Sequence, residues 1–440
     1  MMIVMIDIRL LREEPERVKD GIAKKNADPV LVDVFLKLDA EWREVVAALD
    51  EKRAEQKKLS SERNIEAAKK NKEDMKALDE KRATLENERA VVWMQIPNLP
   101  NDDVPVGVND EENKTRKKPD EPKKFDFQPK DHVVLGEGLD ILDIERAGKV
   151  SGSRFSYLKR DAARLEFAII QFVFEFLADA KNLRSIIKKE KLTVSDAPFI
   201  PVIPPVLIKS EAMRGMGYVE RGKDQIYHFL EDDLYLVGTA EQSIGPMHGG
   251  EIFQETDLPR RYIAFSTSFR REAGSHGKDV RGLIRAHQFD KAEMFSLTLP
   301  RLSSDEHLLL LGLEESMMQE LEIDYRVLDI CTGDLGDPAA AKFDIEAWMP
   351  GENEGTGAYR ETHSTSNTTD FQSRRLNIRY RNSESGKPEF VHMLNGTAFA
   401  VGRILVAILE NYQQKDGSVV IPKVLQKYVG KKIITPPDVD

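Results

Sequence analysis

Three stretches of the chain concentrate charged and polar residues on segments that otherwise have the apolar character of strands. They are 239–241, a segment from 269 to 293 interrupted by a glycine-rich loop, and 359–364 together with 395–397 and Arg403. Arginines on rigid strands can bind phosphates bidentately. Carboxylates beside them can hold Mg²⁺, and other carboxylates can bind an ammonium group or a hydroxyl. The pattern therefore predicts electrostatic alignment of an anion with a triphosphate, because no nucleophile and base stand out as a pair.

Simpler readings of the same residues remain open at this point. A single arginine or glutamate on a strand is most often a surface ion pair, and Thr239 or Asn395 could be a turn residue. The histidines of these stretches lack the spacing of metal ligands, and no zinc site is expected. No dinucleotide-binding glycine motif or P-loop occurs in the chain. The residues alone indicate a nucleotide-binding α+β enzyme.

Strand-like runs connected mostly by loops and turns must position these groups. The runs are 199–209, 261–270, 283–297, 325–331, 342–349, 374–381 and 390–396. Strongly apolar helices are predicted over 161–182 and 397–413. This order favours an α+β fold in which an antiparallel sheet carries flanking helices.

A long helical arm is predicted ahead of the sheet. Mostly apolar residues recur with alternating spacings of four and three from Leu31 to Leu59, with polar members at Lys52 and Gln56, and again from Met75 to Ile96. These are heptad seams, joined by a short turn within a break-prone stretch over 60–74. They predict an antiparallel two-helix coiled coil, and about 30 residues per helix give an arm of about 45 Å.

The predicted tip of this arm is basic. Residues 52–72 contain eight basic side chains and three acidic ones. A basic tip on a rod suits a phosphate backbone, although a coiled coil can equally serve dimerisation. The whole chain is acidic, with 76 acidic and 65 basic residues. That balance excludes a uniformly basic nucleic-acid-binding protein, so any such contact requires a local patch.

The composition and the pattern of the chain also indicate its cellular location and its domain organisation. The single cysteine, Cys331, excludes an internal disulfide framework. No apolar run approaches the roughly 20 residues of a membrane span. We expect a cytoplasmic protein without membrane association. Three domains are predicted: an N-terminal domain over 1–108 with its arm at about 28–97, a linker over 109–130 and a catalytic domain over 131–440.

Several motifs resemble the three signature motifs of class II aminoacyl-tRNA synthetases. They are GTAEQS, FRREAGSHGKDVRGLIRAHQFDKAEMF, YRETHSTSNTTDFQSRRLNIRYR and HMLNGTAFAVGRILVAILENYQ. Together with MIDIRLLREEPERV from Met5, the arm and IPNLPNDDVPVG, the whole chain is similar to the seryl-tRNA synthetases of bacterial type. The resemblance implies a class II catalytic domain and the formation of seryl-adenylate from serine and ATP.

The resemblance also implies roles by position. Serine would be bound by Thr239, Ala240, Glu241, Arg270, Glu293, Asn395 and Thr397. ATP would be bound by Arg270, Arg271, Glu272, Arg285, Phe289, Glu361, Thr362, His363, Ser364 and Arg403. The catalytic groups would be Arg270, Glu361 and Arg403. Mg²⁺, the expected cofactor, would be held by Glu361 and Ser364. A site that hydrogen-bonds the serine hydroxyl would reject alanine, because its own polar groups would be left unpaired.

The implied partners are tRNA(Ser) and a second copy of the chain. The resemblance does not decide whether tRNA(Sec) is a substrate as well. The tRNA would be contacted by Lys57, Lys58, Arg63, Lys69 and Lys70, and the homodimer would form around Pro205. One rival interpretation is a paralogue that loads a carrier protein, which would be expected to lack the arm. Another is a non-catalytic tRNA-binding protein, which would be expected to have lost Arg270, Glu361 or Arg403.

Overall fold

The structure, a computed structural model, describes residues 6–274 and 281–437. The predicted start of the family resemblance at Met5 and the middle of the glycine-rich loop, 275–280, lie outside these residues. The chain divides into two compact units, one ending at Pro100 and one beginning at Asn101. The predicted domain limits of 1–108, 109–130 and 131–440 stay a prediction.

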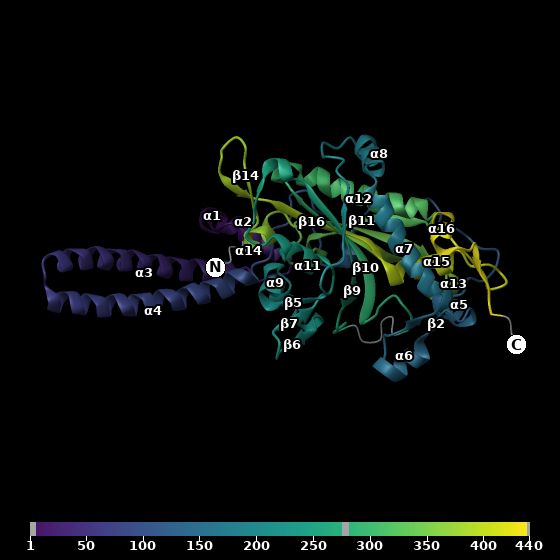
Figure 1. Ribbon diagram of the computed structural model, residues 1–440, viewed down its shortest axis with the longest axis horizontal. Coiled ribbons are helices and arrows are strands. Elements are labelled where there is room, and N and C mark those ends of the chain that lie inside the picture. The colour runs from purple at the N-terminus through teal and green to yellow at the C-terminus, as the bar shows by residue number, and fades with distance from the viewer. Residues whose placement is uncertain (1–5, 275–280, 438–440) are drawn as a thin grey trace. The chain divides into compact units, whose positions relative to one another are not determined.

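The first unit contains a long antiparallel helical hairpin, which confirms the predicted arm (Figure 1). Two short helices, α1 (Ile8–Glu13) and α2 (Pro15–Ala23), precede α3 (Val30–Ser61) and α4 (Ile65–Gln95). At 1.5 Å per residue, α3 is about 48 Å long. The short turn predicted within 60–74 consists of 62–64, and the Asn64 side chain caps α4 there by accepting from the Ala67 amide at 3.2 Å.

Polar contacts fix the pairing of the two long helices. Asp39 on α3 is fully buried and accepts hydrogen bonds from Arg89 on α4 at 2.7 Å and from Arg12 at 2.8 and 2.9 Å. Nearer the tip, the buried Asn71 donates to the Lys52 carbonyl at 3.0 Å and to Gln56 at 2.9 Å. These bonds are satisfied in one register only, so they specify how α3 and α4 align.

The second unit is built on an eight-stranded sheet in the order β1-β11-β12-β13-β16-β10-β9-β4. Its pairs are antiparallel except for β4 beside β9. The strands are β1 (Lys114–Lys117), β4 (Ile200–Val202), β9 (Arg260–Phe269), β10 (Gln288–Thr298), β11 (Tyr325–Asp329), β12 (Ala341–Met349), β13 (Ala358–Asn367) and β16 (His392–Ala400). This confirms the predicted α+β class.

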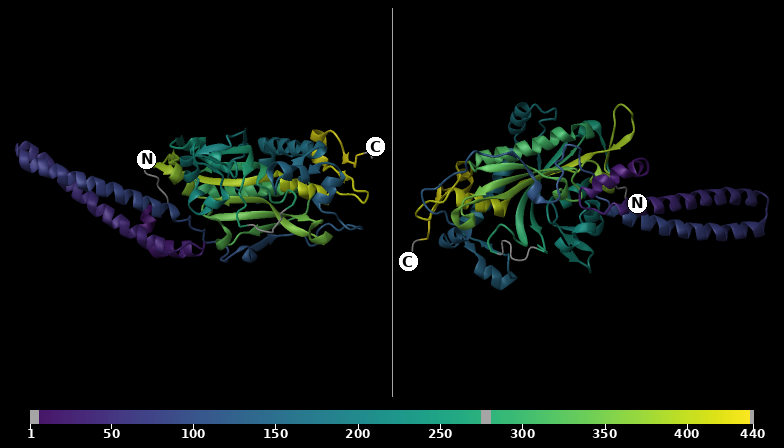
Figure 2. Two further views of the ribbon diagram at one scale, coloured as in Figure 1. Left: turned by 90° about the horizontal axis from the view of Figure 1, so that it is seen from below. Right: turned by 180° about the vertical axis from the view of Figure 1, so that it is seen from behind.

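One face of the sheet is covered by the helices α7 (Arg160–Ala178), α12 (Ser303–Glu320) and α15 (Val401–Asn411), which can be followed in Figure 2. Two further helices pack on these: α5 (His132–Gly138) contacts α15, and α8 (Ala180–Glu190) contacts α12 and α7. Ala292 and Met294 of β10 join Leu394 and Ala398 of β16 in the core beneath these helices. Side chains alternate along a strand, so the residues between them face the opposite side. That side carries the site described below.

Smaller elements surround this core. They are β2 (Leu142–Asp143), α6 (Ile144–Ser151), β3 (Tyr157–Leu158), β5 (Leu207–Lys209), α9 (Ser210–Gly215), α10 (Val219–Gly222), β6 (His228–Phe229), β7 (Leu234–Leu236), α11 (Glu241–Ile244), β8 (Ile252–Gln254), α13 (Glu352–Gly355), α14 (Phe371–Leu376), β14 (Arg379–Arg381), β15 (Pro388–Phe390), β17 (Val419–Val420), α16 (Gln426–Val429) and β18 (Ile433–Ile434). Among the described residues, no helix is both long and apolar enough to span a membrane.

Some predicted element boundaries were wrong. The helix predicted over 161–182 is two helices, because Asp179 adopts an extended conformation and caps α8. The helix predicted over 397–413 begins only at Val401, since β16 continues to Ala400. The strand predicted over 374–381 is helical to Leu376, then turns at Asn377, whose φ is +57°.

Candidate active site

A cavity of about 750 Å³ opens on the side of the sheet away from the apolar helices. Side chains from β10, β12, β13 and β16 form its floor, and α11 and the segments 217–226, 283–286 and 335–339 form its walls. Because several strands end or bend here, groups from distant parts of the sequence reach one space. The cavity divides into an end rich in buried carboxylates and an end rich in arginines.

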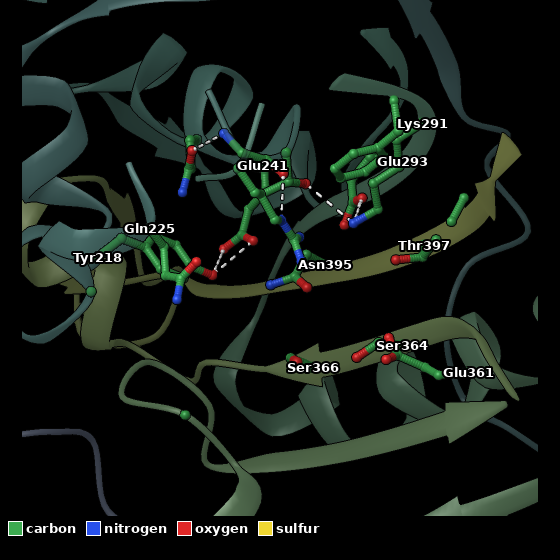
Figure 3. Close-up of a pocket in the computed structure, with 18 of the residues that line it drawn as sticks. Tyr218, Gln225, Glu241, Lys291, Glu293, Glu361, Ser364, Ser366, Asn395 and Thr397 are labelled. Atoms are coloured by element: carbon green, nitrogen blue, oxygen red, sulfur yellow. Dashed lines mark hydrogen bonds and ion pairs between the residues drawn. The ribbon is translucent and has the colours of Figure 1, made fainter. Parts of the chain in front are cut away.

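The carboxylate end contains Glu241, Glu293 and Lys291; in Figure 3 the Glu241 carboxylate points toward Tyr218, and Lys291 lies next to Glu293. Glu241 is 3% exposed and Glu293 is 1% exposed. The Lys291 ammonium pairs with Glu293 and lies 3.3 Å from the Thr239 hydroxyl. A buried pair of carboxylates with one lysine carries a net negative charge, so this end suits a further cation such as a substrate ammonium group.

The strand register brings two more polar side chains to the same end. A bulge between Ala292 and Glu293 places Glu293 directly opposite Thr397 of β16. Asn395 lies two residues earlier on β16, so it shares that face, and both β16 side chains are buried. They offer a hydroxyl and an amide beside the carboxylates, which are groups that can recognise a small polar substrate.

Burial and charge perturb the carboxyl of Glu241. Its burial, and then the negative charge of Glu293, raise the pKa of Glu241 to about 7. Opposing this rise, the Gln372 amide donates to Glu241 at 2.7 Å and the Tyr218 hydroxyl lies 2.9 Å from it. Burial and the nearby Glu241 charge raise the pKa of Tyr218 well above its ordinary value, so its hydroxyl stays protonated and acts as the donor.

The arginine end starts at the carboxyl terminus of β9. The guanidinium of Arg270 lies over the ring of Phe289, 5.4 Å from its centroid. Arg285 donates to Glu272 at 2.7 Å. Glu272 has a φ of +50°, an uncommon conformation for a non-glycine residue. A flat aromatic ring next to fixed guanidinium groups can take a nucleobase and its phosphates.

Glu361 and Arg403 complete the arginine end. They form an ion pair of 3.0 Å, and Arg403 also donates to the Glu361 carbonyl at 2.8 Å. Partial burial alone would raise the pKa of Glu361, but the positive charges of Arg403 and Lys342 outweigh it and lower the pKa to about 2. The carboxylate therefore stays ionised at any pH at which the protein is used.

The donor set at this point fits a hard divalent cation. Glu361 and Ser364 both line the cavity from β13, and they offer a carboxylate and a hydroxyl oxygen. No group of three or more His, Cys, Asp or Glu side chains capable of holding a metal occurs among the described residues. Mg²⁺ commonly takes one or two protein oxygens and completes its shell with phosphates and water. These two residues therefore suit Mg²⁺ that arrives with a nucleotide.

Most of the residues predicted from sequence line this single cavity. They are Thr239, Glu241, Arg270, Glu272, Arg285, Phe289, Glu293, Glu361, Thr362, Ser364, Asn395, Thr397 and Arg403. The structure thus gathers positions spread over more than 160 residues of sequence, and which substrate group each one binds stays a prediction.

Three predicted residues do not line it. His363 faces the helix side, because the pleat directs its neighbours Thr362 and Ser364 the other way, and its ring packs 5.1 Å from Phe399. Ala240 is fully buried in an apolar cluster. The exposed Arg271 contributes a main-chain hydrogen bond to Gln225. Whether the His363 or Arg271 side chain contacts ATP stays a prediction.

Other cavity residues were missed by the sequence analysis. They include Tyr218, Gln225, Lys291, Lys342, Ser366 and Thr368. For Lys291 a signal was present, because alternation along β10 places it on the same face as Phe289 and Glu293. Tyr218 lies in a segment with no motif, so only its tertiary contact with Glu241 identifies it.

The five predicted tRNA-binding residues lie around the tip of the hairpin in the first unit. Lys57, Lys58, Arg63, Lys69 and Lys70 are all exposed. In the described part of the chain none of them forms an ion pair, whereas Lys52 and Arg53 further down pair with Asp74 and Asp50. The tip therefore presents uncompensated positive charge, the property that a phosphate backbone requires.

Two families match parts of this sequence. Residues 5–100 match the seryl-tRNA synthetase N-terminal domain, and residues 226–412 match the tRNA synthetase class II core domain (G, H, P, S and T). A serine–tRNA ligase of Acidothermus cellulolyticus is 44% identical, with 98% of this chain and all of that protein aligned. The serine–tRNA ligase of Dictyoglomus turgidum is 45% identical with the same coverage.

Solved structures give the same picture. The seryl-tRNA synthetase of Pyrococcus horikoshii, crystallised with ATP, superposes with a TM-score of 0.87 at 37% identity, over 99% of this chain and all of the other. The cytoplasmic serine–tRNA ligase of Naegleria fowleri in complex with AMP superposes with a TM-score of 0.85 at 34% identity, over 99% of each chain. A prolyl-tRNA synthetase of Giardia lamblia has 14% identity and a TM-score of 0.52, and it shares the fold alone.

Proposed function

The chain belongs to the seryl-tRNA synthetase family, and from that premise we propose how its own side chains divide the work of a serine–tRNA ligase. The enzyme joins serine to tRNA at the expense of ATP. The serine carboxylate attacks the α-phosphate of ATP and pyrophosphate leaves. The tRNA 3′ hydroxyl then attacks the adenylate and AMP leaves. Both steps depend mainly on alignment and charge stabilisation.

Serine occupies the carboxylate end of the cavity in this proposal. Thr239, Glu241 and Glu293 receive its ammonium and hydroxyl groups, with Asn395 and Thr397 alongside. The observation that carries the proposal is the buried pair Glu241 and Glu293 within the cavity that also holds the three arginines. A pocket whose polar groups need the serine hydroxyl discriminates against alanine.

ATP occupies the arginine end. Phe289 packs against the base, Arg270 binds the α-phosphate and the serine carboxylate, and Arg403 binds the γ-phosphate. Glu272 and Arg285 orient each other through their 2.7 Å hydrogen bond. Glu361 and Ser364 would hold Mg²⁺, which supplies charge neutralisation for the phosphates when it is bound.

The arm serves tRNA(Ser). The exposed, unpaired basic side chains at its tip support this role, because each phosphate contact contributes to affinity and to salt dependence. Few aromatic residues accompany them, so the tip recognises backbone shape rather than bases. Whether tRNA(Sec) is also charged stays open, and a cytoplasmic location is proposed because that is where charged tRNA is used.

A homodimer is proposed around the segment between β4 and β5, which includes Pro205. Large apolar side chains are exposed on it and on the two strands that flank it, with Ile200 at 51%, Ile203 at 79% and Leu207 at 44%. Such a group of exposed apolar residues is typical of a protein interface. Sedimentation at micromolar concentration tests this, and a monomer would contradict it.

The direct test of the function is aminoacylation. The purified chain should attach labelled serine to a transcribed tRNA(Ser) and leave a tRNA(Ala) transcript uncharged. Alanine substituted at the five tip residues Lys57, Lys58, Arg63, Lys69 and Lys70 should impair this charging. Equal charging of both tRNAs would contradict the proposed partner.

A further inference from the structure

Glu241 is held from two sides, by Tyr218, which lies outside every motif of the sequence analysis, and by Gln372, to which that analysis assigned no role. The Tyr218 hydroxyl lies 2.9 Å from Oε2 and 3.1 Å from Oε1 of Glu241. The Gln372 amide donates to Oε1 at 2.7 Å. Tyr218 precedes α10, whereas Gln372 lies on α14, more than 150 residues further along the chain. Both oxygens of this buried carboxylate therefore have a donor before any substrate is bound.

The orientation of Gln372 is itself determined. Its Nε2 faces two acceptors, the Glu241 carboxylate at 2.7 Å and the Met216 carbonyl at 3.3 Å, and this requires the amide nitrogen on that side. Its Oε1 lies 3.1 Å from the Thr368 hydroxyl. Gln372 thus links the segment that carries Tyr218 to the carboxylate that Tyr218 contacts, and the side chain is fully buried.

The local backbone directs Tyr218 inward. Gly217 has a φ of +83°, which favours glycine, and a Cβ at this position would lie 2.9 Å from the Phe371 ring. The turn after α9 can therefore pack closely on α14 and direct Tyr218 into the cavity. A tyrosine placed by a glycine turn and facing a buried acid indicates a specific role.

The charged groups near Glu241 come from β10 and from the residue that follows β9. From β10 come Glu293, whose charge raises the pKa of Glu241, and Lys291, whose charge lowers it. Arg270, after β9, acts on Tyr218, and Gln372 on α14 is neutral. With the pKa of Glu241 at about 7, each hydrogen bond to its carboxylate decides how much of it is charged at neutral pH.

We propose that Tyr218 is a positioning residue for the substrate amino group: together with Gln372 it holds Glu241 charged and aimed at the ammonium ion of serine. The inference rests on the proposed assignment of Glu241 to serine. An ammonium ion needs a charged acceptor, so serine binding is linked to loss of a proton from Glu241, and the two donors favour the deprotonated state.

The test is Tyr218→Phe, which removes the hydroxyl and keeps the ring. Serine-dependent pyrophosphate exchange gives kcat and both Michaelis constants as a function of pH. Loss of one charge-assisted hydrogen bond should raise KM for serine about tenfold at neutral pH and move the acid limb of kcat/KM upward by about one pH unit. KM for ATP should stay within about twofold, and the defect should shrink as the pH rises.

Tyr380→Phe is the matched control. Tyr380, on β14, is also buried, and its hydroxyl donates to Glu389, on β15, at 2.7 Å. Both residues lie outside the cavity. Its loss should leave both Michaelis constants and the pH profile unchanged. Gln372→Met should shift the pH profile in the same direction as Tyr218→Phe, and it carries the test if the latter does not fold.

The outcomes distinguish the positioning role of Tyr218 from the proposed function of the enzyme. If Tyr218→Phe and Gln372→Met leave KM for serine and the acid limb unchanged, the positioning role is wrong although the enzyme is a serine–tRNA ligase. Equal, pH-independent increases in both Michaelis constants would also overturn it, because they indicate general damage. Absence of serine-dependent exchange in the wild-type protein would overturn the proposed function, and this inference with it.

Discussion

Replacing Arg403 with alanine removes a guanidinium that the structure fixes at the arginine end of the cavity. Arg403 lies in the first turn of α15 and is held by three bonds, to the Glu361 carboxylate, to the Glu361 carbonyl and to the Ile284 carbonyl at 3.2 Å. A charge-assisted contact to phosphate contributes about 1.5–3 kcal/mol. Its loss should lower kcat/KM for ATP by about 10- to 150-fold in pyrophosphate exchange.

The same substitution acts on Glu361. Without Arg403 the pKa of Glu361 rises from about 2 toward its ordinary value. The pKa is depressed in the folded state, so its contribution to stability is present above the ordinary value and is lost only as the pH falls through about 2. At neutral pH this contribution is present in the wild-type protein and is lost together with Arg403, so the Tm of the variant should fall. Exchange is therefore measured well below the Tm of both proteins, where a loss of activity reflects ATP binding and not unfolding.

A control arginine makes the result interpretable. Arg301 pairs with Glu255 at 2.8 Å outside the cavity, and Arg301→Ala should keep wild-type exchange. Wild-type exchange by Arg403→Ala would refute the assignment of Arg403 to the nucleotide. An equal loss in both variants would refute the claim that position in the cavity matters.

Three further predictions concern serine, tRNA and stability. Glu293→Ala should raise KM for serine far more than KM for ATP in the exchange assay, and equal increases would assign Glu293 another role. Deletion of 34–92 should leave a dimer in sedimentation that is active in exchange but charges tRNA poorly, whereas an inactive monomer would identify the arm as a dimerisation coil. Alanines at the five tip residues should reduce the slope of log affinity for tRNA against log salt concentration by up to about 0.9 per lost phosphate contact. Glu306→Ala should cost about 3–5 kcal/mol in denaturant unfolding, since it leaves the buried Arg261 guanidinium without its 2.6 Å partner; a loss below about 1 kcal/mol would contradict this.

The helical arm could be predicted well because its signal is local and repeated. Phe35, Val45 and Leu49 of the predicted seam are buried on α3, and Leu85 is buried on α4. Near the tip the seam becomes polar, at Lys52 and Gln56, and the sequence does not show what these residues contact. There the pairing continues through Asn71, which bonds across to α3, and hydrophobic periodicity does not register such a contact.

The site could be predicted only where a motif marked it. Strand alternation explains why Thr362 and Ser364 reach the cavity while His363 does not, a distinction that follows from the pleat once β13 is known. Tyr218 lies in no motif, and Gln372 lies in one without any sign that it reaches Glu241, so neither could be found in this way. Their significance is a contact between residues far apart in sequence, and it appears only when α14 packs beside the turn at Gly217.

Pyrophosphate exchange measured separately with each of the twenty amino acids tests the central claim most directly. The assignment of Glu241, Glu293 and Thr397 to a small hydroxyl-bearing amino acid predicts exchange with serine, very little with alanine or threonine, and none without an amino acid. Exchange that does not depend on serine, or that proceeds equally well with another amino acid, would contradict it.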